Sequence, residues 1–128
     1  MTTLQDYLNN ARVEENNDNV PQPEDCADLS VDDIVTRIIC QVNMVRDNGD
    51  TSNKVFYAGI CKDVKDNMHR HGNDRYVALV NCGSRDKSGS VEETLGELGF
   101  DVGERANNGG DDESVIVYVI KKDRNFKR

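Results

Sequence analysis

The chain has 128 residues, enough for one domain with its own hydrophobic core, and it carries a formal net charge of −8. It contains no Trp and no apolar run of the roughly 18 to 20 residues that a membrane-spanning helix requires. No signal peptide opens it, and its four cysteines form no C-x-x-C pair, which argues against a zinc site or a disulfide framework. These features predict a cytoplasmic protein with reduced thiols and no association with membranes.

Residues 1–28 are expected to form an acidic arm ahead of the folded domain. Within residues 3–13, Leu4, Tyr7 and Leu8 recur at helical spacing and predict a short helix. Residues 14–28 contain Pro21 and Pro23 among Asn and Asp and carry few apolar side chains, which is typical of a linker. The domain is therefore expected over residues 29–128, with the arm either mobile or docked as a helix.

The strongest helical pattern follows this arm. Ser30 is a suitable N-cap, and the apolar side chains that follow recur at i, i+3, i+4 and i+7. The apolar stripe comprises Val31, Ile34, Val35, Ile38, Ile39, Val42 and Val45. Because β-branched residues are poor intrinsic helix formers, this helix is expected to depend on packing against the rest of the domain.

Residues 54–72 contain the signals for a strand, a tight turn and a short helix. The run from Val55 to Ile60 is rich in the residue types that favour strands. Asp63 stands where an N-cap is expected, and Gly72 is placed to end the helix. Gly59 is unusual inside a strand and indicates that another group approaches the backbone closely there.

This segment resembles the second half of the GIY-YIG nuclease signature, in which a YIG strand runs into a helix bearing a catalytic Arg and often a His. Tyr57-Ala58-Gly59 is similar to YIG, and His71 falls at the place of the His. The place of the Arg is occupied by Asn67. The resemblance therefore implies a GIY-YIG-like fold whose phosphate-stabilising cation has been lost.

The rest of the chain alternates between strands and one more helix. Strands are predicted over residues 76–80 and 115–120, the latter central because its apolar run is unbroken. Between them, residues 81–89 are expected to form a loop, Ser90 and Glu93 a capping box, and Gly99 a helix stop. The predicted fold class is α/β, with a small three-stranded mixed sheet flanked by helices. Strands 54–60 and 76–81 are expected to run parallel.

The GIY strand of the family has no counterpart ahead of Tyr57. Residues 117–122 resemble that strand and its polar turn, displaced to the C-terminus, which implies a permuted domain. The alternative is an additional central strand with a buried Tyr118. The metal-binding Glu of the family matches Glu92, which has a Leu three residues later. The resemblance then implies catalytic roles for Tyr57, Tyr118 and His71, with Glu92 holding Mg²⁺.

The charge is divided unevenly along the chain. Residues 54–90 carry +3, from seven basic and four acidic residues, whereas residues 91–120 carry −7, from one basic and eight acidic residues. A phosphate backbone would be attracted to the basic segment. The candidate binding residues there are Gly59, Lys62, Lys65 and Arg75.

Three functions stay open from the sequence. The first is a divergent GIY-YIG-like domain that has lost efficient nuclease activity, needs no cofactor and binds nucleic acid or a protein partner. The second is a Mg²⁺-dependent endonuclease in which Arg70, three residues after Asn67, replaces the lost cation. The third is an acidic protein that mimics nucleic acid. Because the helix after Asp63 is expected to be exposed, replacing Asn67 with Arg is expected to cost little stability.

Overall fold

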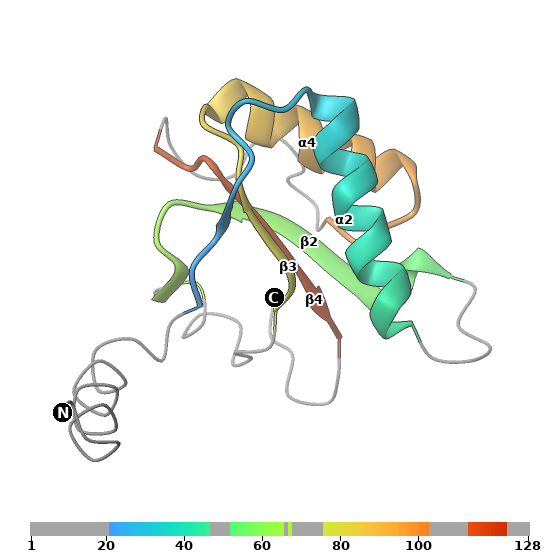
Figure 1. Ribbon diagram of the computed structural model, residues 1–128. Helices are drawn as coiled ribbons and strands as arrows, with labels where there is room; N and C mark the ends of the chain where they lie inside the picture. Colours follow the sequence, from blue (N-terminus) through green and yellow to red (C-terminus); the bar gives the residue numbers. More distant parts are fainter. Residues whose placement is uncertain (1–20, 47–51, 66, 68–75, 103–112, 123–128) are drawn as a thin grey trace, which may run out of the picture.

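The computed structural model describes residues 21–46, 52–65, 67, 76–102 and 113–122 (Figure 1). They form an α/β domain, which confirms the predicted class, although the sheet has four strands rather than three. The elements in chain order are β1 (Glu24–Asp25), α2 (Val31–Val45), the 3-10 turn η1 (Asn53–Val55), β2 (Phe56–Cys61), β3 (Tyr76–Asn81), α4 (Arg85–Glu97) and β4 (Ile116–Lys121). The predicted helix over 3–13 and nearly all of the segment 105–113 lie outside the described residues.

The sheet is mixed, with the strand order β1-β3-β4-β2. β4 pairs antiparallel with both β2 and β3, which confirms the central position predicted for residues 115–120. β2 and β3 therefore run parallel to each other, as predicted, but β4 separates them. The fourth strand, β1, pairs parallel with β3 and lies within residues 14–28, which were predicted to be a linker. The folded unit thus crosses the boundary expected at residue 29.

Helix α2 begins where the sequence predicts. The hydroxyl of Ser30 accepts a hydrogen bond from the backbone N–H of Asp33 at 3.1 Å, and the helix ends at Val45. The side chains of Ile34, Ile38 and Val42 are fully buried. Burial of the predicted stripe is therefore what holds this β-branched helix in place.

Helix α4 spans Arg85–Glu97, and its cap lies six residues before the one predicted at Ser90, so this prediction was wrong. Ser84 is the N-cap, its hydroxyl accepting from the N–H of Lys87 at 3.2 Å, after Gly83 turns the chain with a φ of +83°. The predicted end is confirmed. Gly99 adopts a φ of +99°, and the N–H of Phe100 donates to the carbonyl of Leu95 at 3.0 Å, as in a Schellman motif.

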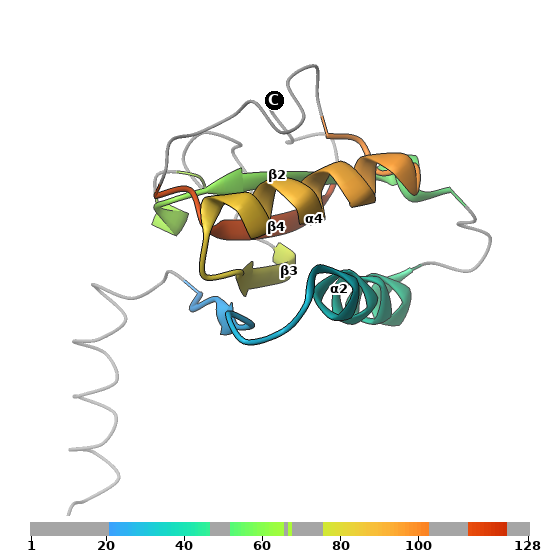
Figure 2. The ribbon, with the colours of Figure 1, turned by 90° about the horizontal axis from the view of Figure 1, so that it is seen from above.

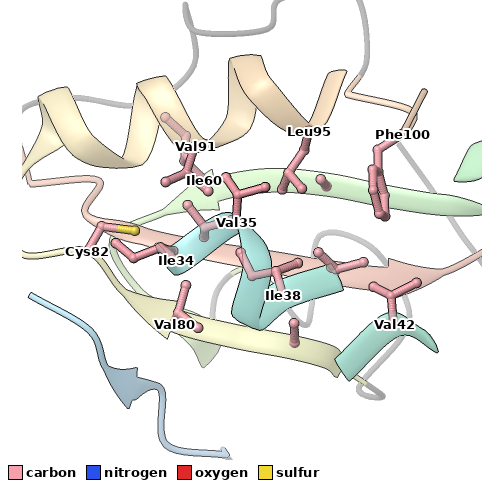
Figure 3. Close-up of a cluster of buried hydrophobic side chains, with 14 of the residues drawn as sticks. Ile34, Val35, Ile38, Val42, Ile60, Val80, Cys82, Val91, Leu95 and Phe100 are labelled. Atoms are coloured by element: carbon pink, nitrogen blue, oxygen red, sulfur yellow. The ribbon is translucent and has the colours of Figure 1, made fainter. Parts of the chain in front are cut away.

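Both helices pack on one face of the sheet. Figure 2 shows α4 crossing over β2 and β4, while α2 lies beside β3. Their apolar side chains and alternate strand residues form the main core, drawn in Figure 3, which includes Ile34, Ile38, Val80, Val91 and Leu95. The remaining strand side chains form a second buried cluster on the opposite face, and the candidate site lies there.

The outer edge of β2 is also covered. The backbone of Asp101 exchanges hydrogen bonds with Phe56 and Ala58, and its carboxylate accepts a 2.8 Å bond from the ammonium of Lys122. No helix in the described part of the chain is long and apolar enough to cross a membrane.

Candidate functional site: a tyrosine cluster on the sheet

Three tyrosines, one from each antiparallel strand, meet on the face of the sheet opposite α2 and α4. The ring of Tyr118 on β4 lies centrally, with its centroid 6.2 Å from that of Tyr57 on β2 and 5.9 Å from that of Tyr76 on β3. Tyr118 is buried, whereas Tyr57 and Tyr76 are partly exposed. The cluster therefore offers aromatic surface to solvent at its two flanks and a buried ring at its centre.

Gly59 makes room for the central ring. It is the cross-strand partner of Tyr118, and a Cβ atom at residue 59 would lie only 2.6 Å from Cζ of that tyrosine. No real side chain tolerates such a contact without a shift of the ring or the strand. The close approach predicted from this glycine thus comes from Tyr118, whose ring packs over the backbone of β2.

The turn after β2 begins the short helix predicted there. A carboxylate oxygen of Asp63 accepts a 2.9 Å bond from the N–H of Lys65, and its carbonyl accepts one of 3.1 Å from the N–H of Asn67. Asp63 therefore acts as the N-cap that the sequence predicts. Val64 is buried against the tyrosines, which directs this first turn onto the tyrosine face.

Asn67 is buried, contrary to the exposed position expected for it, with only 3% of its surface accessible. Its amide nitrogen donates to the hydroxyl of Tyr76 at 3.0 Å, and that hydroxyl donates in turn to the carbonyl of Val64 at 3.4 Å. Burial raises the pKa of Tyr76, so the phenol stays protonated at neutral pH and keeps its role as a donor. Asn67 is thus a neutral side chain that packs against the cluster.

Tyr76 is a member of the cluster that the sequence analysis did not select. It was assigned to a strand, but its face was not predicted, because a bulge between Tyr76 and Ala78 shifts the alternation of side chains in β3. The pattern of an ideal strand gives no sign of such a shift.

The other candidate residues lie at different places. Lys62 and Lys65 are exposed beside the start of the short helix, at the end of the strand that carries Tyr57. Arg70, His71 and Arg75 fall outside the described residues. Of the two lysines, Lys65 directly follows Val64, which packs against the tyrosines, so Lys65 is a described candidate cation beside the tyrosine face.

Glu92 lies in the helical layer and not with the tyrosines. It is buried on α4 next to Val91, which packs into the core on the opposite face of the sheet. The sheet itself separates Glu92 from Tyr57 and Tyr118, so the structure does not assemble these residues into one site. In the described part of the chain, no group of three or more His, Cys, Asp or Glu side chains is placed to hold a metal ion.

Comparison of the chain with protein-family models, with curated proteins and with solved structures found no match.

Proposed function

We propose that this chain is a divergent, permuted GIY-YIG-like domain that binds nucleic acid through its tyrosine face without cleaving it efficiently. The observation that carries the proposal is the contact of the Tyr57 and Tyr118 rings between the neighbouring antiparallel strands β2 and β4, with Gly59 beneath the second ring. In a permuted domain, the displaced GIY strand is expected beside the YIG strand, and β4 occupies that position.

The charges near this face favour a phosphate backbone as the ligand. Lys62 and Lys65 are exposed in the turn whose Val64 packs against the tyrosines, and the segment from residue 54 to 90 is basic in a chain that is otherwise acidic up to residue 120. Each lysine that contacts a phosphate releases counterions, so affinity is expected to fall steeply with salt. The partly exposed rings of Tyr57 and Tyr76 add apolar surface for contacts with sugar or base.

Efficient cleavage is not expected from this arrangement. In the proposed fold, the cation that stabilises the phosphate charge in the transition state is replaced by Asn67. The amide of Asn67 is hydrogen-bonded to Tyr76. The endonuclease alternative requires Glu92 beside the tyrosines, but α4 carries it on the other side of the sheet. The binding function is therefore favoured over the Mg²⁺-dependent one.

The test is fluorescence anisotropy with labelled single- and double-stranded oligonucleotides at increasing salt. Lys62→Glu and Lys65→Glu should each weaken binding about tenfold at low salt, because each replaces an attraction with a repulsion. Arg37→Glu is the control, since it makes the same charge change at an exposed position of α2, on the opposite face of the sheet. Absence of binding, or an equal loss in all three variants, would contradict the proposal. Binding of a basic protein through residues 1–29 or 91–113 would favour the nucleic-acid mimic instead.

A parallel incubation of the same oligonucleotides with Mg²⁺ tests the endonuclease alternative. The expected result is intact substrate. Cleavage that Glu92→Gln abolishes would show that the alternative is right and that Glu92 holds the metal ion.

A further inference from the structure

Two buried cysteines directly follow the neighbouring strands β1 and β3. The parallel register pairs Glu24 with Val80 and Asp25 with Asn81, so the next positions along the two strands are Cys26 and Cys82. The ladder extends this far, because the N–H of Cys26 donates to the carbonyl of Asn81 at 2.9 Å. Neighbouring strands lie about 4.8 Å apart, which is within the range of about 4.4 to 6.8 Å that separates the Cα atoms of a disulfide.

The side chains of both cysteines point to the same face of the sheet. Each is at most 1% exposed, and both belong to the main core under the helices. Burial raises the pKa of both thiols, that of Cys82 to about 12, and the proximity of Cys26 adds to the increase at Cys82. In the closed structure both groups are therefore protonated and shielded from reagents.

Access to the pair depends on β1, the least extensive strand. It has two residues, and the segment that follows it is attached to α4 by bonds of 2.7 and 2.8 Å from the ammonium of Lys87 to the carbonyls of Ala27 and Leu29. Short edge segments of this kind open locally at low free-energy cost, without global unfolding. Such an opening would expose Cys26 while leaving the rest of the sheet intact.

We infer that Cys26 and Cys82 are a modification site, at which a low-molecular-weight disulfide oxidises the pair to an intramolecular disulfide. In the open state the Cys26 thiolate attacks one sulfur of the small disulfide and releases one small thiol. While β1 is still open, Cys82 has lost the cover of Cys26 and can give up its proton, and its thiolate attacks the Cys26 sulfur of the mixed disulfide and releases the second small thiol. The protein loses two electrons and two protons, which the small disulfide takes up.

The consequence of oxidation is a covalent bond at the point where the acidic residues 1–20 enter the domain. In the reduced protein this junction is held by non-covalent contacts, among them the ion pair of Glu24 with Arg37. The inference rests on the register of β1 and β3 and is independent of any nucleic-acid binding.

The experiment treats the folded full-length chain with oxidised glutathione, blocks the remaining thiols and maps the products by mass spectrometry. A peptide linking Cys26 to Cys82 is expected. Cys40, which is exposed, should carry only glutathione, and Cys61, which is buried on the opposite face, should stay reduced. The melting temperature of the oxidised protein should rise by several degrees, because the bond closes a long loop.

Two variants make the outcome specific. Cys40→Ser should leave formation of the linked peptide unchanged, whereas Lys87→Met, which weakens the attachment of residues 27–29, should accelerate it. A mixed disulfide that persists at Cys26 would overturn the inference, and so would a linked peptide that forms only in denaturant. Failure to modify Cys26 while Cys40 is fully modified would overturn it as well.

Discussion

The ring of Tyr118 lies directly over the backbone of Gly59, its cross-strand partner. This contact joins the central strand to β2 on the tyrosine face and fixes where the ring of Tyr118 meets Tyr57 and Tyr76. The geometry of the whole cluster thus depends on the absence of one side chain.

Replacing Gly59 with Ala should destabilise the domain by about 1 to 3 kcal/mol, because the added methyl group must displace the tyrosine ring or the strand. Urea denaturation of Gly59→Ala, Tyr118→Leu and the double variant measures this effect. In the Tyr118→Leu background the cost of the alanine should be smaller, since the flat ring that it meets is gone. If Gly59→Ala lowers the free energy of unfolding equally in both backgrounds, the ring of Tyr118 is not the reason that residue 59 must be glycine.

Lys87 attaches the segment between β1 and α2 to α4 by donating to two backbone carbonyls. Lys87→Met keeps most of the aliphatic chain but leaves both carbonyls without this partner, so the free energy of unfolding should fall by about 1 to 3 kcal/mol. Lys65→Met, at an exposed position, serves as the control and should change it by less than about 0.5 kcal/mol. Equal urea midpoints for the two variants would contradict the anchoring role of Lys87.

The pair of Glu24 and Arg37 predicts a small dependence of stability on pH. The hydrogen bond from Arg37, at 2.7 Å, lowers the pKa of Glu24 below the ordinary value of 4.5. A lowered folded-state pKa gives a stabilisation that is present above pH 4.5 and is lost as the pH falls through the folded value. Solvent screens this exposed pair, so the effect should be slight. Thermal melts from pH 6 to 3 should show a shallower acid decline for Arg37→Ala than for the wild type.

Much of the fold follows from local patterns in the sequence. The apolar stripe and Ser30 define α2, and the unbroken run at residues 116–120 identifies a central strand because only such a strand is covered on both faces. By contrast, β1 consists of two acidic residues in a proline-containing segment. The pairing of β1 with β3 is supported by the burial of Cys26 and by the bonds of Lys87 to the segment after β1. These are tertiary contacts, which cannot be predicted from the local sequence.

The candidate site is predictable only in part, for a related reason. Alternation along β2 and β4 places Tyr57 and Tyr118 on a common face once the strands are neighbours. The spacing of the apolar residues in α4 places Glu92 next to the side of the helix that is buried. The same spacing does not specify which face of the sheet the helix covers. That choice is made by the connections between the strands and the helix, and it separates Glu92 from the tyrosines.

The substitution Asn67→Arg distinguishes a packing residue from a vacant catalytic position. The sequence alone suggests that it should be tolerated, but the structure buries Asn67 and bonds its amide to Tyr76. A guanidinium there would be desolvated and would displace that bond, so we expect a loss of about 3 kcal/mol or more in the free energy of unfolding. Lys65→Arg, in the same turn but exposed, is the control and should leave stability unchanged. Urea denaturation measures the loss, and incubation with an oligonucleotide and Mg²⁺ measures any gain of cleavage. An Asn67→Arg protein that is as stable as the wild type and cleaves would show that the arginine reaches a phosphate-binding position, and the packing role assigned to Asn67 would then be wrong.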